Sequence, residues 1–151
     1  MKARITISTL FLTLLVLTTS AFAQEAATWT AKSSIATAKP GDKFEVKVSA
    51  KVTQGWHIYS TSPVEEGPVP TEIDFGPASS LKKAGKIRQP KPIVKFDENF
   101  GVNTEYYDTD VVFTVPVVVK DNAKGGKQKM VVEVTFMACN DRMCLPPKTI
   151  D

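Results

Sequence analysis

The clearest alternation of apolar and polar residues covers residues 44–53, with the sequence FEVKVSAKVT. Strict alternation is the period of a β-strand that buries one face and exposes the other. Pro40 and Gly41 precede this segment and suit a tight turn, because proline fixes φ and glycine accepts a positive φ. The pattern therefore predicts a half-buried strand that begins after a turn.

Similar short segments recur along the rest of the chain and predict further strands. These segments are residues 29–37, 56–60, 71–75, 86–89, 111–119 and 129–138. Residues 121–126 are expected to join the last two as a hairpin loop, and residues 61–70 and 90–107 are expected to be irregular. No segment after residue 23 keeps a helical period for three turns, and 10 prolines and 8 glycines interrupt the chain. We therefore predict an all-β fold, an immunoglobulin-like sandwich of two antiparallel sheets.

The first 23 residues have a different pattern. A basic start, Met1 to Arg4, precedes an uncharged apolar run over residues 5–19, and Ala21-Phe22-Ala23 follows. This order is typical of a secretory signal peptide that is cleaved after Ala23. The run is shorter than the roughly 20 residues of a membrane-spanning helix, and no later run could span a bilayer. We expect an exported domain over residues 24–151.

Charge changes this picture little. The chain has 19 lysines and arginines against 16 acidic residues. Two of the basic residues, Lys2 and Arg4, lie in the predicted signal peptide, so the exported part is close to neutral. Nothing in this balance indicates binding to nucleic acid or to an anionic membrane surface. Export does matter for Cys139 and Cys144, because an even number of cysteines in an oxidising compartment usually forms disulfides.

The cysteine pair allows three interpretations. A structural bridge closing so short a loop would add roughly 2 kcal/mol in the chain-entropy model, less than a bridge between distant segments. A zinc site needs four ligands, and the two cysteines are accompanied by a single histidine, His57, so no metal is expected. The third interpretation is an exchangeable redox disulfide. Spacing alone does not separate the first from the third.

The phase of the predicted strand 129–138 favours exchange. Cys139 falls in the same phase as Glu133 and Thr135, whereas Phe136 and Ala138 belong to the apolar stripe. The sulfur of Cys139 is therefore expected on the wetter face, where a partner thiol can reach it. Pro146 and Pro147 cannot continue a central strand, so both sulfurs are expected at or beyond the strand end.

Several segments resemble one family, the periplasmic N-terminal domain of DsbD, a membrane thiol–disulfide transporter. Phe136-Met137-Ala138 and the segment from Cys139 to Pro147 resemble its active-site hairpin. Residues 97–101, DENFG, with Tyr106, Tyr107 and the strand at 111–119, resemble its cap loop and next strand. Residues 55–59, GWHIY, resemble its aromatic strand. The resemblance covers most of residues 24–151, and the cysteine hairpin is its most specific part.

The resemblance implies an immunoglobulin-like fold and a reversible Cys139–Cys144 disulfide that needs no cofactor. It implies electrons arriving from a membrane reductase with a thioredoxin-like domain. They would leave for periplasmic thioredoxin-fold proteins, namely a disulfide isomerase and a cytochrome-maturation thioredoxin. Asp97 and Glu98 match two acidic residues beside the pair in that family. His57 is either a partly buried histidine of a predicted strand or a site residue, and Tyr59, in the same phase of that strand, is a candidate for the pocket wall. Phe100 is either a loop anchor or the cap, and Arg142 and Met143 are candidates for partner contacts.

The chain also departs from the family. Four residues separate its cysteines where the best-known members have five, and Asn99 stands where an aromatic cap is expected, which leaves shielding to Phe100. The sequence stops where a final strand would start, which suggests either truncation or a free-standing module. Of the two cysteines, Cys144 is expected to attack partners and Cys139 to resolve the mixed disulfide. We predict a thiol–disulfide oxidoreductase module of the protein-disulfide reductase type. The alternative is a non-catalytic binding domain with an inert hairpin disulfide.

Overall fold

The computed structural model describes residues 25–151, so the predicted signal peptide lies outside the described residues. Within this range the chain forms eleven β-strands and no helix, and all of the strand pairs are antiparallel. The all-β prediction is confirmed. No helix among the described residues is long and apolar enough to cross a membrane.

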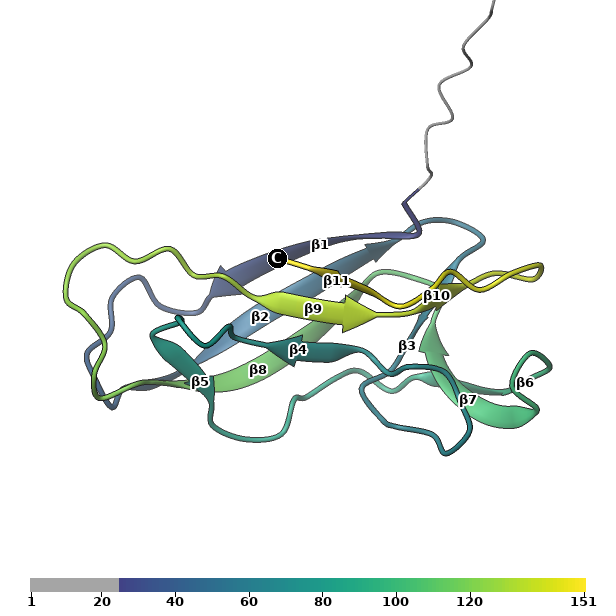
Figure 1. Ribbon diagram of the computed structural model, residues 1–151, viewed down its shortest axis with the longest axis horizontal. Helices are drawn as coiled ribbons and strands as arrows, with labels where there is room; N and C mark the ends of the chain where they lie inside the picture. The colour runs from purple at the N-terminus through teal and green to yellow at the C-terminus, as the bar shows by residue number, and fades with distance from the viewer. Residues whose placement is uncertain (1–24) are drawn as a thin grey trace, which may run out of the picture.

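Two sheets face each other as the layers of a sandwich (Figure 1). One layer has the order β1-β2-β8-β5, formed by Ala27–Ser33, Lys43–Val52, Val111–Val119 and Leu81–Lys83. The opposite layer has the order β11-β9-β4, formed by Lys148–Ile150, Glu133–Phe136 and Glu72–Asp74. Two antiparallel sheets packed face to face by short strands make an immunoglobulin-like sandwich.

A third sheet lies at one end of the sandwich and carries the cysteines (Figure 1). Its order is β10-β3-β7-β6, formed by Ala138–Cys139, His57–Tyr59, Val102–Tyr107 and Ile93–Asp97. Four strands brought together from distant parts of the sequence thus set the surroundings of Cys139.

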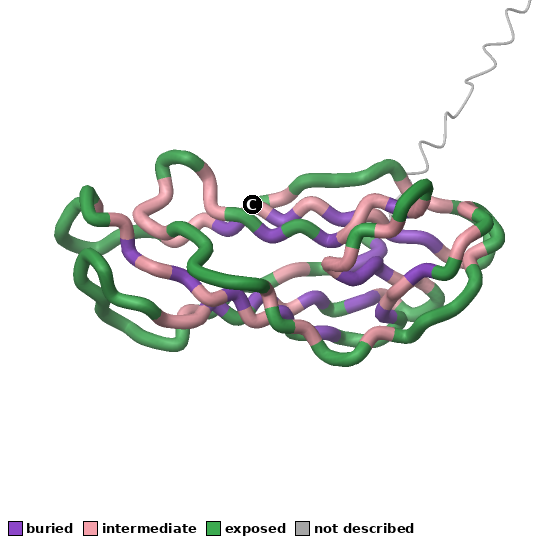
Figure 2. The backbone as a smooth tube through the Cα atoms, turned by 90° about the horizontal axis from the view of Figure 1, so that it is seen from below, coloured by how far each residue is buried: buried purple, intermediate pink, exposed green. Residues whose placement is uncertain are grey.

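The core is filled by the inward face of each layer. In β2, the residues Val46, Val48, Ala50 and Val52 are buried while their neighbours are not, as the alternation predicted. Figure 2 shows the same buried and exposed alternation along the strands. Trp29 connects the layers, because its ring lies 6.0 Å from Phe113 in β8 and 5.2 Å from Phe136 in β9. Burial of such apolar surface is the main driving force for folding.

Residues 90–107 are not irregular as predicted. They form the β6–β7 hairpin, in which Ile93–Asp97 pair with residues 102–106. The turn is built by Asp97, whose carboxylate accepts the N–H of Asn99 at 2.9 Å and whose carbonyl accepts the N–H of Gly101 at 2.7 Å. Gly101 has φ of +70°, which favours glycine. The alternation of apolar and polar residues did not predict β6, because four of its five residues are exposed and neither face is buried.

The predicted strand over residues 129–138 is also corrected. Only Glu133–Phe136 form β9, and the chain then changes sheets at Met137 to enter β10. The predicted hairpin at residues 121–126 is wrong as well, since β8 pairs with β2 and β5 whereas β9 pairs with β4 and β11. That segment instead crosses from one layer to the other.

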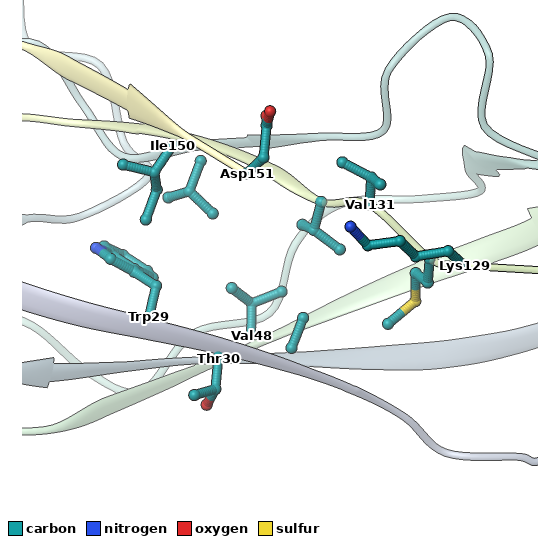
Figure 3. A pocket seen from close by; sticks show the side chains of 11 residues that line it. Trp29, Thr30, Val48, Lys129, Val131, Ile150 and Asp151 are labelled. Carbon is teal, nitrogen blue, oxygen red and sulfur yellow. The ribbon is translucent and has the colours of Figure 1, made fainter.

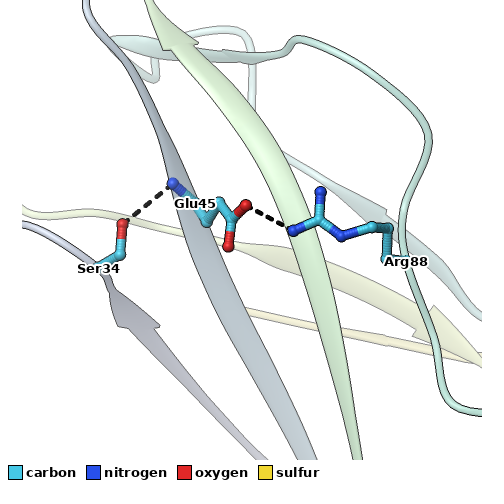
Figure 4. Close-up of polar contacts among 3 residues, drawn as sticks. All are labelled: Ser34, Glu45 and Arg88. Carbon is cyan, nitrogen blue, oxygen red and sulfur yellow. Dashed lines mark hydrogen bonds and ion pairs between the residues drawn. The ribbon is translucent and has the colours of Figure 1, made fainter.

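Two further predicted segments, residues 29–37 and 86–89, also differ from the strands observed. The first strand ends at Ser33, where the side-chain hydroxyl bonds to the carbonyl of Ile35 at 2.7 Å and closes a turn. Residues 86–89 form only an isolated bridge, Arg88 to Thr114, and the strand that pairs with β8 is β5 instead. Arg88 is held there by Glu45, whose backbone N–H donates to the hydroxyl of Ser34 (Figure 4). Both charged groups are exposed, so the ion pair adds little stability.

Candidate redox site

The two cysteines close a tight hairpin loop. Cys139 and Cys144 form a disulfide and pair as a β-bridge, with 4.0 Å between their Cα atoms. Asn140 shapes the loop, since its side-chain oxygen accepts the N–H groups of Arg142 at 2.9 Å and Met143 at 3.0 Å. Asparagine suits such a turn because its short amide bonds to the backbone two or three residues on. The local sequence therefore presents both sulfurs at the base of one turn.

The two sulfurs differ in exposure. Cys139 is 0% exposed, while Cys144 is partly exposed. The prediction that Cys139 lies on the wetter face of its strand is therefore wrong. The chain changes sheet at Met137, and Ala138 and Cys139 are both buried. The expected ranking of the sulfurs is confirmed, since Cys144 is the more accessible. A partner disulfide can reach the pair only from the side of Cys144.

Tyr59 connects the buried sulfur to a carboxylate. Its hydroxyl lies 3.1 Å from the sulfur of Cys139 and donates to the carboxylate of Asp97 at 2.8 Å. One hydroxyl has a single proton, and a carboxylate is a stronger acceptor than a disulfide sulfur. The proton therefore points to Asp97 in the oxidised state. Burial, followed by the hydrogen bond and the charge of Asp97, raises the pKa of Tyr59 far above its usual value, so Tyr59 stays a donor.

His57 lies beside this group, directly opposite Cys139 in the β3–β10 pair. Its Nε2 is 3.3 Å from the hydroxyl oxygen of Tyr59. Because the proton of Tyr59 goes to Asp97, Nε2 can bond to that oxygen only as a donor, which fixes the proton of the neutral ring on Nε2. The ring also packs on Tyr106, with 4.8 Å between centroids. Sequence reasoning did not single out Tyr106 as a site residue, although it lay in a segment that resembled the family.

Burial lowers the pKa of His57, and the opposing charges only partly offset this effect. Asp97, Asp141 and Asp108 raise its pKa, while Lys95 lowers it further. In the unfolded chain the pKa returns to about 6.5, so the unfolded state takes up a proton that the folded state resists. The stability that His57 contributes is therefore present above that pKa and lost as pH falls through it.

We accordingly expect the free energy of unfolding, with the disulfide intact, to decline between pH 7.5 and pH 5.5. In His57→Gln the decline should be smaller, because glutamine can donate to Tyr59 but does not titrate. Urea unfolding of both proteins at the two pH values measures the difference. An equal decline in both would show that other groups cause it.

The remaining predicted site residues differ in their contacts and in their exposure. Phe100 is half-buried and packs edge-on against Tyr59, with 6.2 Å between ring centroids. The structure thus brings Phe100, Tyr59, His57 and Asp97 to one place beside Cys139. Glu98 is exposed and makes no hydrogen bond or ion pair with any residue in the range 25–151. Arg142 and Met143 are exposed at the tip of the hairpin, and Met143 is 52% exposed.

A cavity lies away from the cysteines. It has a volume of about 250 Å³ and opens between β1 and the end of the chain, lined by Trp29, Val48, Met130, Val131 and Ile150 among others (Figure 3). None of its lining residues belongs to the cysteine hairpin or to β3. In the described part of the chain, no group of three or more histidine, cysteine or acidic side chains is arranged to hold a metal ion.

The fold and the site define a β-sandwich domain with a disulfide hairpin at one end, in which Cys139 is buried and Cys144 is partly exposed. The chain matches the family described as "Thiol:disulfide interchange protein DsbD, N-terminal" over residues 24–150, and it belongs to this family. The family's domain is periplasmic and takes part in thiol–disulfide exchange. Cys139 and Cys144 are the two cysteines of the chain, and they form its disulfide.

Among solved structures, the N-terminal domain of DsbD from Neisseria meningitidis, crystallised in the reduced form, is similar. It shares 22% sequence identity with this chain over 74% of each chain, with a TM-score of 0.49. No curated protein matched the sequence.

Proposed function

We propose that this domain is a protein-disulfide reductase module of the periplasm, which takes electrons from a membrane reductase and passes them to thioredoxin-fold proteins. Disulfide isomerases and cytochrome-maturation thioredoxins are the recipients that the family suggests. The observation that carries the proposal is the asymmetry of the pair, with Cys139 buried against Tyr59 and Cys144 open to a partner. Residues 1–23 are proposed to direct export and to be removed before Gln24, which N-terminal sequencing of the exported protein would test.

The exchange proceeds in two balanced steps. The thiolate of Cys144 attacks one sulfur of the partner disulfide, forming a mixed disulfide and releasing a partner thiolate. The thiolate of Cys139 then attacks the sulfur of Cys144, which reforms the Cys139–Cys144 disulfide and releases the second partner thiolate. Two electrons pass to the partner, and its two thiolates take protons that the domain's thiols have lost. No cofactor takes part.

The accessory residues have proposed roles in these steps. Tyr59 donates to the sulfur of Cys139 when that sulfur carries charge, and Asp97 holds the hydroxyl in reach in the oxidised state. For Glu98 we propose no role beyond that of an acidic side chain near the cysteine pair. Phe100 packs over Tyr59 and limits access from that side. Arg142 and Met143 contact the partner, because they flank Cys144 and are exposed.

A direct test mixes the reduced domain with an oxidised thioredoxin-fold protein and follows the thiols by alkylation. We expect one partner disulfide to be reduced for each domain oxidised. The Cys144→Ser variant should reduce none, since it lacks the attacking thiol. Persistence of the partner disulfide in the presence of the reduced wild-type domain would refute the proposal.

A redox role also predicts that the domain tolerates reduction. The bridge closes a loop of about six residues, so its loss should cost roughly 2 kcal/mol in the chain-entropy model. The buried core of the sandwich does not depend on it. We expect the reduced domain to keep its β-sheet circular dichroism at 25 °C and to unfold at somewhat lower denaturant. Unfolding on reduction alone would instead favour a structural bridge.

A further inference from the structure

The strand β6 is an edge strand that exposes three large apolar side chains. Ile93, Val94 and Phe96 are 42%, 62% and 56% exposed, and together they are half of the six exposed large hydrophobic residues in the described chain. The sheet order ends at β6, so its outer backbone groups have no strand to pair with. Edge strands are normally protected by charge, proline or brevity. β6 carries the charge of Lys95 at its centre, but its three exposed apolar side chains still form a concentration that marks an interaction surface.

This edge is continuous with the redox site. Asp97, the last residue of β6, accepts the hydrogen bond of Tyr59, and Tyr59 contacts the sulfur of Cys139. The β6–β7 hairpin and the cysteine hairpin project from the same end of the molecule (Figure 1). The exposed Met143 lies beside Cys144 on the second hairpin. A protein whose disulfide reaches Cys144 therefore approaches the end of the molecule to which β6 belongs.

The apolar residues of β6 lie on both faces of the sheet. Ile93 is paired with Tyr106 and shares its face, whereas Val94 and Phe96 alternate to the opposite face. A partner resting on one face would leave the other apolar group in water. A partner strand added at the edge would contact both faces and would also pair with the free backbone groups.

A second copy of the chain fits this edge poorly. Symmetric antiparallel pairing that uses the whole of β6 must be centred on Lys95, which places Lys95 opposite Lys95 of the other copy. Like charges directly opposite each other destabilise a strand pair. The edge therefore favours a different protein, and the partner that must approach this end is the one that exchanges disulfides.

We propose that β6 is a docking strand for the thioredoxin-fold partner. An extended, apolar segment of that partner adds to the free edge of β6 while the partner's disulfide reaches Cys144. This inference rests on the proposed function and specifies how the partner is held.

The test compares the rate at which the reduced domain reacts with a protein disulfide and with a small-molecule disulfide. The double variant Val94→Ser with Phe96→Ser is reduced and mixed either with an oxidised thioredoxin-fold protein or with an aromatic small-molecule disulfide. Loss of buried apolar contacts at an interface weakens the docked complex, so the ratio of the protein rate constant to the small-disulfide rate constant should fall about tenfold or more. Val112→Ser is the matched control, because Val112 is also exposed, at 42%, but lies in β8 of another sheet; it should keep the wild-type ratio.

Each outcome decides the proposal. An unchanged ratio in the double variant, or an equal fall in the control, would overturn the docking role. So would a double variant whose main change is loss of a dimer in gel filtration, since the occupant would then be a second copy. Hydrogen exchange on the trapped Cys139→Ser complex should show new protection of β6 amides, and unchanged exchange there would contradict strand addition. If the wild-type domain reacts with the small disulfide but with no protein partner, the proposed function itself fails.

Discussion

Cys139→Ser should accumulate a covalent complex with an oxidised thioredoxin-fold partner, whereas Cys144→Ser should accumulate little or none. Cys144 is the accessible sulfur and Cys139 is fully buried, so the first attack must come from Cys144. Removing Cys139 leaves the mixed disulfide without an internal thiol to break it. The partner's own second cysteine is removed in this experiment, so that neither side can release the complex.

The complex is seen as a band on a non-reducing gel that disappears on reduction. The change in yield is expected to be close to all-or-none, because the buried Cys139 cannot reach a partner when it is the only thiol. Equal trapping by the two variants, or trapping by Cys144→Ser alone, would reverse the assignment of the sulfurs. Failure of both would argue against exchange with that partner.

Tyr59→Phe is the second change with a large expected effect. Among the described residues, the hydroxyl of Tyr59 is the side-chain donor within hydrogen-bond distance of the sulfur of Cys139. A hydrogen bond to a charged group contributes about 1.5–3 kcal/mol, and each 1.4 kcal/mol is a factor of about ten in rate or affinity. The bond favours the thiolate over the thiol, but a thiolate's nucleophilicity falls with its pKa, so only about half of this energy appears in the rate. We therefore expect the resolving attack by Cys139 to slow by roughly three- to tenfold, while phenylalanine keeps the packing on Phe100.

Single-turnover kinetics of the reduced domain with an oxidised partner separates the two steps. The mixed disulfide should form at close to the wild-type rate and then decay slowly. Tyr106→Phe is the control, since the hydroxyl of Tyr106 makes no hydrogen bond within residues 25–151. Unchanged decay in Tyr59→Phe, or equally slow decay in the control, would remove the hydroxyl from the mechanism.

Much of the fold could be predicted because half-buried strands alternate apolar and polar residues along the sequence. Residues 111–119 form a strand with the predicted limits, since their alternation matches a central strand of one layer. The prediction failed where residues are exposed on both faces, as in β6, and where one extended run serves two sheets, as on either side of Met137. The first situation leaves no periodic signal, because neither face is buried. In the second the alternation continues through Met137, so it does not mark the change of sheet.

The site was predictable in its chemistry and less so in its geometry. The family resemblance indicated Cys139, Cys144 and Asp97, and the alternation of β3 put His57 and Tyr59 on one face. The contact between Tyr59 and Cys139 joins residues 80 positions apart and depends on how β10 pairs with β3. Strand pairing over such a separation follows from the assembled sheet and not from any local pattern.

The reduction potential of the domain decides whether the Cys139–Cys144 disulfide is exchangeable. The domain is equilibrated at pH 7 with graded mixtures of reduced and oxidised glutathione or dithiothreitol, and its thiols are counted by alkylation. We expect a midpoint above about −300 mV, in the range of disulfides that exchange with cellular partners. A midpoint well below that value, or a disulfide that is reduced only once the domain is unfolded, would contradict the account and identify an inert structural bridge.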